Sequence, residues 1–201
     1  HQLYTRAKPD YSGRVTVPVL WDKQRDTIVS NESADIIRMF NSAFDALTEN
    51  DDDYYPKALR SEIDAINAEV YEQVNNGVYR CGFATTQEAY ERAFESLFSA
   101  LDRLEARLQR QTWLVSDTLT EADWRLFTTL VRFDSVYHGH FKCNRRRIAD
   151  YPALSAFTRR LYEMPGVADT VDFEQIKQHY YYSHETINPT RVVPRGPAKP
   201  F

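Results

Sequence analysis

The amino-acid sequence predicts a mainly α-helical protein with a short β-β-α unit near its N-terminus. Apolar residues recur at helical spacing through most of the stretch after residue 57, whereas two short β-rich runs separated by a polar turn precede residue 30. The chain has 201 residues, of which 42% are hydrophobic, and is long enough to enclose a sizeable core. We therefore expect a small β-containing part followed by a larger helical part.

The first β-rich run, residues 14–21, is interrupted by a proline. Its alternating residues are Val15, Thr16, Val17, Pro18 and Val19. Because proline has no N–H, it breaks the ladder of a strand and leaves backbone groups free for a ligand, and we expect the bond before Pro18 to be cis. A polar turn over residues 22–26 then leads to a second short strand over residues 27–29. The polar residues 1–13 are expected to form an irregular lead-in.

A helix is predicted directly after the second strand. Ser30 and Asn31 have side chains that favour a helix start. The apolar residues that follow at helical spacing, and would pack on the strands, are Ile36, Ile37, Phe40, Ala43 and Phe44. Residues 50–56 include three consecutive aspartates but lack the glycine of a calcium-binding loop, so we expect a solvated linker there.

Helices account for most of the chain after residue 57. The first is marked by Ile63, Ile66, Val70 and Val74 and is expected to end at Asn75-Asn76-Gly77, and the second is expected over residues 90–108. Thr120 and Asp123 have capping-box spacing at the start of the most apolar helix, residues 124–136. Further helices are predicted after Tyr151-Pro152 and over residues 173–181, and the proline-rich tail from residue 188 is expected to be extended.

Composition and charge argue against several functional classes. The net charge is −4 with both signs interleaved, so a nucleic-acid partner is not expected. No apolar run approaches the roughly 20 residues of a membrane span, and the N-terminus has no apolar signal core, so neither membrane insertion nor export is expected. Cys81 and Cys143 are isolated, as is typical of free buried thiols in a reducing cytoplasm. His138 and His140 have no apparent third partner, so no metal site is expected.

Six segments of the chain carry a resemblance to a known family. They read VPVLWD, IVSNES, IIRMFNSAF, GVYRCGFATTQEAY, LTEADWRLFTTLVRFDSVYHGHFKCN and HYYYSHETINPT. Together they closely resemble the glutathionyl-hydroquinone reductases, the Xi class of glutathione transferases. The resemblance implies that residues 1–48 are the C-terminal half of a thioredoxin-like, glutathione-binding domain, residues 57–187 an all-helical glutathione-transferase C-terminal domain, and residues 188–201 an extended tail. It also implies a homodimer formed through the helical domain.

The resemblance implies an enzyme that uses glutathione as co-substrate and needs no metal. In the family a cysteine thiolate attacks the glutathionyl group of a glutathionyl-hydroquinone, the free hydroquinone is released, and a second glutathione resolves the mixed disulfide. That cysteine lies in a Cys-Pro-Trp-Ala motif, which these 201 residues lack. We therefore expect the chain to begin after the motif and to be catalytically incomplete. The alternative is a non-enzymatic module of the same fold, used for dimerisation or partner binding.

Glutathione is a peptide with two carboxylates and an α-amine, so its site needs backbone pairing, anion donors and one acidic partner. Val17, before the proline, can offer its N–H and C=O for pairing, and the following helix start can offer backbone N–H groups, the Ser33 hydroxyl and the Glu32 carboxylate. The residues that match the family's glutathione-contacting positions are Arg14, Val15, Thr16, Val17, Glu32 and Ser33. Glu32 and Ser33 could instead serve only as helix-cap residues.

The chain has thirteen tyrosines, and a phenol can donate a proton or stabilise an adjacent thiolate. Tyr79 is expected on a loop just past a helix end, and the resemblance implies that it is the proton donor and acceptor. The resemblance also implies that Tyr137 and Tyr180 lower the pKa of the family's cysteine. Without the resemblance each would be a hydrogen-bonded core aromatic, and Tyr181 or Tyr182 could replace Tyr180 if the register shifts.

Overall fold

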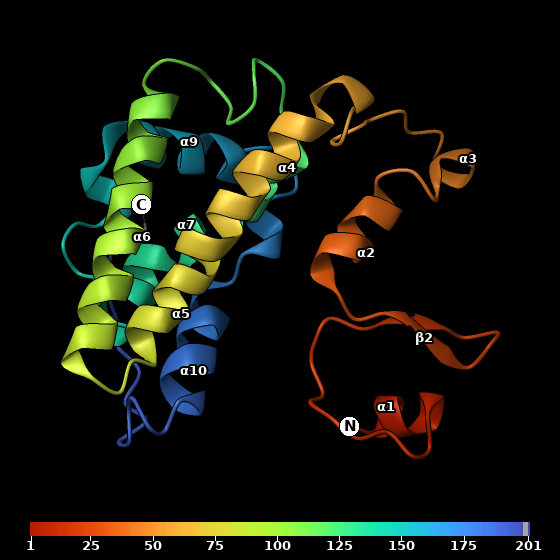
Figure 1. Ribbon diagram of the computed structural model, residues 1–201, viewed down its shortest axis with the longest axis horizontal. Coiled ribbons are helices and arrows are strands. Elements are labelled where there is room, and N and C mark those ends of the chain that lie inside the picture. The colour runs from red at the N-terminus through yellow and green to blue at the C-terminus, as the bar shows by residue number, and fades with distance from the viewer. Residues whose placement is uncertain (199–200) are drawn as a thin grey trace. The chain divides into compact units, whose positions relative to one another are not determined.

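In the computed structural model, which describes residues 1–198 and 201, the chain forms two compact units, His1–Pro56 and Lys57–Phe201 (Figure 1). The first unit combines a two-stranded sheet with short helices, and the second is built from helices. The predicted fold class, a short β-β-α unit followed by an all-helical unit, is confirmed.

The sheet of the first unit consists of β1 (Leu20–Asp22) and β2 (Thr27–Ser30). The strands pair antiparallel, with Trp21 opposite Ile28. The prediction of the second strand is confirmed, whereas the first is shorter than predicted because residues 14–19 form no strand. Alternating valines favour a strand, but a ladder also needs a partner strand, and residues 14–19 have none among the described residues.

The prediction of an irregular lead-in is wrong, because Gln2–Ala7 form helix α1. Tyr4 is buried, and its hydroxyl donates to the Thr16 carbonyl oxygen at 2.8 Å and accepts from the Thr16 N–H at 3.2 Å. Arg6 also forms an ion pair with Asp26, at 2.6 Å. A helix held by one aromatic residue shows little apolar periodicity, and this explains why the sequence pattern missed it.

Helix α2 (Ser33–Phe40) ends earlier than the apolar spacing predicted, and the short helix α3 (Asp45–Thr48) follows after a turn. Asn41 stands at the end of α2. Its side-chain oxygen accepts from the Tyr54 N–H at 2.7 Å, and its amide donates to Asp53 at 2.8 Å. These side-chain bonds to the linker compete with continuation of the helix.

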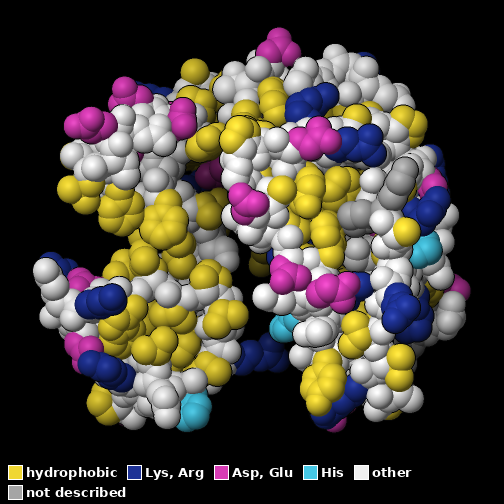
Figure 2. All heavy atoms as spheres, turned by 180° about the vertical axis from the view of Figure 1, so that it is seen from behind, with side chains coloured by type: hydrophobic (Ala, Val, Ile, Leu, Met, Phe, Trp, Pro, Cys, Tyr) yellow, Lys and Arg dark blue, Asp and Glu magenta, His cyan; other side chains and the backbone are white. Residues whose placement is uncertain are grey.

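The first unit buries little apolar surface. Among its described residues, the buried hydrophobic side chains are those of Tyr4 and Ile36. The large hydrophobic residues of its sheet and of the segment around α2 and α3 that are exposed are Val29, Ile37, Phe40, Phe44 and Leu47. Figure 2 shows hydrophobic side chains gathered on one face of this unit. A unit with so small a core gains little stability from its own packing.

Among its described residues, the second unit contains seven α-helical segments, one of them a single turn, and five shorter 3₁₀- or π-helical segments. In chain order they are η1 (Lys57–Leu59), α4 (Arg60–Glu69), η2 (Val70–Asn75), α5 (Asn76–Gly82), α6 (Gln87–Leu108), α7 (Glu121–Arg132), η3 (Phe133–Tyr137), the single turn α8 (His138–His140), η4 (Ile148–Asp150), α9 (Pro152–Tyr162), η5 (Ala168–Thr170) and α10 (Phe173–Ser183). Segments η2 and η3 are π-helical. Helices α6, α7 and α9 enclose the core with α4 and α5.

The predicted helix end at Asn75-Asn76-Gly77 is wrong, because α4, η2 and α5 follow one another without a break. The buried side chains of Val74, Val78 and Cys81 extend the helical spacing beyond this point. Packing of that apolar face outweighs the weak helix preference of asparagine and glycine.

The capping box at the start of α7 is confirmed. The buried Asp123 carboxylate accepts from the N–H groups of Thr120 and Leu114, each at 2.8 Å. It thereby ties the loop before α7 to the first turn of the helix. The other predicted helices are present as α6, α9 and α10.

The C-terminal tail packs on its own unit. The buried Lys177 ammonium of α10 donates to the carbonyl oxygen of Arg195 at 2.9 Å, and the ring of Phe201 lies 5.2 Å from that of Tyr162. Residues 191–197 form neither helix nor strand, and the extended tail stays a prediction. Pro200, which belonged to that prediction, lies outside the described residues.

No helix in the described part of the chain is long and apolar enough to cross a membrane. The same residues contain no group of three or more histidine, cysteine, aspartate or glutamate side chains that could hold a metal ion.

Replacing Asp123 by alanine should destabilise the helical unit. The change leaves the buried N–H groups of Leu114 and Thr120 without their acceptor. We expect the free energy of unfolding to fall by about 2–4 kcal/mol, measured by urea denaturation. Glu95→Ala, which removes an exposed acid of α6, should change it by less than about 0.5 kcal/mol. Equal losses in the two variants would contradict the capping role.

Candidate functional site

Three tyrosines from separate helical elements meet through their hydroxyl groups. Tyr79 comes from α5, Tyr137 ends η3, and Tyr180 lies in the last turns of α10. The Tyr180 hydroxyl is 2.5 Å from that of Tyr79 and 2.9 Å from that of Tyr137. The structure therefore brings together the three residues to which the resemblance assigned catalytic roles. We call them the tyrosine cluster.

The three rings of the cluster differ in their exposure to solvent. Tyr79 is 39% exposed, whereas Tyr180 is 6% and Tyr137 2% exposed. Tyr79 lies within α5 and not on a loop, which corrects the sequence-based expectation. The cluster thus runs from a half-exposed phenol to a fully buried one.

Burial keeps the inner members of the cluster protonated. It raises the pKa of Tyr137 and of Tyr180 well above the usual value. In Tyr180 this effect is the largest, the bond to Tyr137 lowers the pKa, and the bond to Tyr79 raises it. Three hydroxyl groups joined by two hydrogen bonds use two of their three protons. If the bonds run outward from Tyr137 through Tyr180, the proton of Tyr79 is left free to meet a ligand.

The register question at the end of α10 is answered by these contacts. Tyr180 enters the cluster, whereas the ring of Tyr181 packs on His140 at 4.5 Å and Tyr182 is exposed.

The Phe141 ring packs against all three tyrosines of the cluster. The rings of described residues that lie 5.2–5.9 Å from its ring are those of Tyr79, Phe83, Tyr137, His140, Tyr180 and His184. Gly82, at the end of α5, makes this position possible, because a Cβ atom there would overlap the Phe141 ring. Sequence patterns gave no sign of this pairing, since the two residues are far apart in the chain.

The predicted glutathione-contacting residues lie in the first unit. The peptide bond between Val17 and Pro18 is cis, as predicted, and the Val17 side chain is 90% exposed. Thr16 is held by Tyr4, and its hydroxyl accepts from the Asn31 amide at 2.9 Å. Tyr11 donates to the Arg14 carbonyl oxygen at 2.5 Å. These bonds fix the backbone of residues 14–17.

Glu32 and Ser33 stand at the start of α2, and both are exposed. Glu32 is the N-cap residue, but its side chain makes no capping hydrogen bond within the described chain. The bond between Asn31 and Thr16 brings this helix start beside residues 14–17. The structure thus places the predicted contact residues of the first unit, including Val15, in two adjoining segments.

The two cysteine thiols lie next to each other, whereas the sequence suggested that each was isolated. Both are free and buried, as predicted. Hydrogen bonding between the thiols lowers the pKa of Cys81, while burial raises that of Cys143 far above the usual value. The Cys143 sulfur also lies 3.9 Å from the Val78 carbonyl oxygen. Neither thiol is available at the surface to act as a nucleophile.

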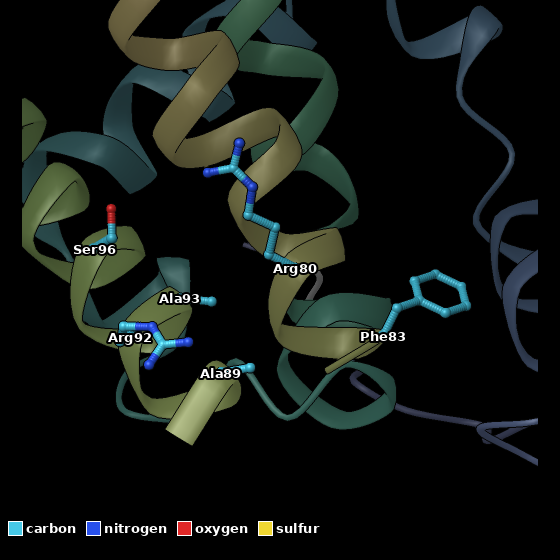
Figure 3. Close-up of a pocket in the computed structure, with 6 residues that line it drawn as sticks. All are labelled: Arg80, Phe83, Ala89, Arg92, Ala93 and Ser96. Carbon is cyan, nitrogen blue, oxygen red and sulfur yellow. The ribbon is translucent and has the colours of Figure 1, made fainter. Parts of the chain in front are cut away.

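A cavity of about 430 Å³ opens between α5 and α6 (Figure 3). It is lined by Arg80, Phe83, Ala89, Arg92, Ala93 and Ser96. Figure 3 shows the Phe83 ring turned away from the other five side chains. Both guanidinium groups are engaged in ion pairs, Arg80 with Glu72 and Arg92 with Glu88. With these cations already neutralised, we assign no ligand to the cavity.

Comparison with known proteins matches both units. The family "Glutathione S-transferase, C-terminal domain" matches residues 87–160. Glutathionyl-hydroquinone reductase PcpF of Sphingobium chlorophenolicum is 60% identical over the whole of this chain and 64% of its own length. Glutathionyl-hydroquinone reductase YqjG of Escherichia coli is 59% identical over 98% of this chain and 60% of its own length. The chain therefore spans less than two thirds of these relatives.

Two solved structures agree closely with this one. Glutathione-bound YqjG gives a TM-score of 0.97 at 58% identity, over 98% of this chain and 64% of that one. Glutathione transferase Xi 1 from Trametes versicolor gives 0.96 at 57% identity, over 100% of this chain and 70% of that one.

A β-β-α unit with a cis-proline, in one chain with this helical unit, defines a glutathione transferase. Within that class, the identity to Xi 1 over 70% of its length shows that the chain belongs to the Xi class of glutathione transferases. The resemblance found in the sequence is thereby confirmed.

Gly82→Ala should disturb the tyrosine cluster. The new methyl group would overlap the Phe141 ring, so we expect the free energy of unfolding to fall by at least about 2 kcal/mol. Gly77→Ala, in the first turn of the same helix, is the matched control. Its methyl group would meet Leu97 at an ordinary 3.5 Å, and the better helix propensity should add about 0.5–1 kcal/mol. Thermal unfolding of the two variants measures both effects, and similar behaviour would contradict the packing argument.

Proposed function

We propose that the protein carrying this chain is a glutathionyl-hydroquinone reductase, which uses glutathione to reduce glutathionyl-hydroquinones to hydroquinones. The observation that most directly supports the proposal is the hydrogen-bonded chain of Tyr137, Tyr180 and Tyr79, in a protein 60% identical to the reductase PcpF. The aromatic rings beside the exposed Tyr79, including Phe83, suit a flat aromatic substrate.

The proposed reaction has two steps. The thiolate of the family's cysteine, in the Cys-Pro-Trp-Ala motif that these residues lack, attacks the glutathionyl sulfur of the substrate. A disulfide bond forms, the sulfur–carbon bond breaks, and the ring carbon takes the electron pair and a proton. A second glutathione thiolate then attacks the mixed disulfide, which gives oxidised glutathione and restores the cysteine thiolate.

The tyrosine cluster supplies the proton in this scheme. Tyr79, the most exposed member, donates to the ring carbon and recovers a proton from the second glutathione. Tyr180 and Tyr137 lower the pKa of the thiolate through the chain of hydrogen bonds that ends at Tyr79.

Glutathione is proposed to bind to the first unit. The Val17 backbone next to the cis-proline pairs with the cysteinyl part of the tripeptide, and Arg14, Val15 and Thr16 complete that edge. The N-terminus of α2 and the Ser33 hydroxyl bind the γ-glutamyl carboxylate, while Glu32 binds the α-amine. Glutathione in the related YqjG structure supports this co-substrate.

Two further proposals concern the oligomeric state and the cellular compartment of the protein. A homodimer formed through the helical unit is proposed because that unit exposes aromatic residues such as Tyr71 and Tyr182. The buried free thiols Cys81 and Cys143 favour the reducing cytoplasm.

Removing the acid or the hydroxyl at the start of α2 should weaken glutathione binding. We expect Glu32→Gln and Ser33→Ala each to cost about 1.5–3 kcal/mol, because each removes a charge-assisted contact. Calorimetric titration with glutathione measures the loss. Asp35→Asn, which removes an exposed acid from the same turn, is the control and should bind as the wild type does. Equal affinity in all four proteins would place glutathione elsewhere.

Replacing Tyr79 should affect turnover, whereas replacing Tyr137 or Tyr180 should affect the pKa of the cysteine. In a protein that joins this sequence to a Cys-Pro-Trp-Ala segment, Tyr79→Phe should lower turnover roughly 10²–10⁴-fold, as expected for loss of a proton donor. Tyr180→Phe and Tyr137→Phe should instead raise the cysteine pKa, so that activity partly returns at higher pH. The pH dependence of alkylation reports that pKa. An unchanged value in both variants would assign these tyrosines to the pocket wall. Absence of turnover in the joined protein without any substitution would favour the non-enzymatic alternative.

The dimer proposal is tested by sedimentation at micromolar concentration. A species heavier than the 23.5 kDa chain is expected, and a monomer alone would contradict the proposal.

A further inference from the structure

A pair of histidines joins the turn α8 to the end of α10. The Nε2 atom of His140 lies 3.1 Å from the Nδ1 atom of His184, which is hydrogen-bond distance. The sequence suggested only that His140 could act with His138, two residues away. The structure pairs it instead with a residue 44 positions later. The proposed reaction uses neither ring.

The histidine pair lies directly against the tyrosine cluster. The His184 ring meets the Tyr180 ring edge-on, with centroids 5.5 Å apart and planes at 84°. His184 follows Tyr180 by four residues, so the two side chains lie on one side of the last turn of α10. Both histidine rings also stack on Phe141, at 5.2 Å and 5.7 Å. Anything that fixes His184 therefore also limits the freedom of Tyr180.

The surroundings of the histidine pair favour uncharged rings, which can form a hydrogen bond with each other. Burial lowers the pKa of His140 to about 4 and also lowers the pKa of His184. Near neutral pH both rings are therefore uncharged, so one facing nitrogen can donate while the other accepts. The nearby charged or titratable groups are Lys142, His179, Tyr180 and Tyr181, and the first two disfavour protonation of the pair.

Tyr180 needs such a restraint more than its neighbours do. Its hydroxyl must remain within hydrogen-bond distance of two others at once, Tyr79 on α5 and Tyr137 on η3. Tyr180 stands near the end of α10, where a helix frays most readily. A bond from the residue that caps α10 to a separate element opposes that fraying.

We propose that the hydrogen bond between His140 and His184 is a positioning device that holds the Tyr180 hydroxyl between those of Tyr79 and Tyr137. His140 and His184 are thus positioning residues that act through Tyr180. Their importance for turnover rests on the proposed function, whereas the positioning itself is measurable without any reaction.

The test measures exchange of tyrosine hydroxyl protons by NMR, in protein labelled with ¹³C at the Cζ atoms of tyrosine and assigned by Tyr→Phe variants. A hydroxyl held in two hydrogen bonds exchanges slowly. We expect His140→Leu and His184→Leu each to speed exchange at Tyr180 by about tenfold or more, the effect of losing roughly one net hydrogen bond. His140→Gln, whose amide nitrogen can take the place of Nε2, should restore slow exchange.

Two internal controls separate positioning from a general loosening of the fold. His138→Leu changes the neighbouring histidine of α8 and should leave Tyr180 unaffected. The buried Tyr151 hydroxyl, which donates to Asp102 at 2.9 Å, should exchange at the same rate in every variant. Unchanged exchange at Tyr180 in both leucine variants, or an equal acceleration at Tyr151, would overturn the proposal. Failure of the catalytic proposal would appear only in the turnover of Tyr79→Phe.

Discussion

The packing of Phe141 against the bare backbone of Gly82 is the constraint on which the candidate site depends. It allows α5 to approach the segment after η3 so closely that tyrosines from three elements share hydrogen bonds. A side chain at residue 82 would separate these elements and, with them, Tyr79 and Tyr137. The chemistry proposed for the hydroxyl groups therefore begins with a steric condition in the core of the helical unit.

The same packing sets the protonation of the tyrosine cluster. The inner phenols are desolvated, which keeps Tyr137 and Tyr180 protonated, while Tyr79 remains half exposed. A buried, neutral pair of donors can orient a third donor without competing for its ligand. In the first unit the arrangement is the opposite, because Val17, Glu32 and Ser33 are exposed, and neighbouring side chains such as those of Asn31 and Thr16 hold their segments together.

The sequence was sufficient to predict those features that depend on local pattern. Helical spacing located α6, Tyr151-Pro152 located the start of α9, and Thr120 with Asp123 located the start of α7. The resemblance selected Tyr79, Tyr137 and Tyr180, and the structure brings these together, although their roles and those of the glutathione-contacting residues stay proposals.

Features set by distant contacts could not be predicted in the same way. Helix α1 depends on the bonds of Tyr4 to Thr16, the end of α2 on those of Asn41, and the continuity of α4 into α5 on burial of Val78. The contact of Gly82 with Phe141 and that of His140 with His184 join residues far apart in the chain, for which no sequence spacing is diagnostic.

The two π-helical segments, η2 and η3, have a consequence for evolution of the family. A π-helical turn accommodates one residue more than an α-helical turn does. Tyr79 follows η2, and Tyr137 closes η3. Loss of a single residue from either segment would therefore leave an uninterrupted α-helix and keep the residues after it in nearly the same orientation, whereas the same loss from a regular α-helix would rotate them by about 100°. A relative with a one-residue gap in one of these segments would thus keep both its helices and the direction of its tyrosine hydroxyl.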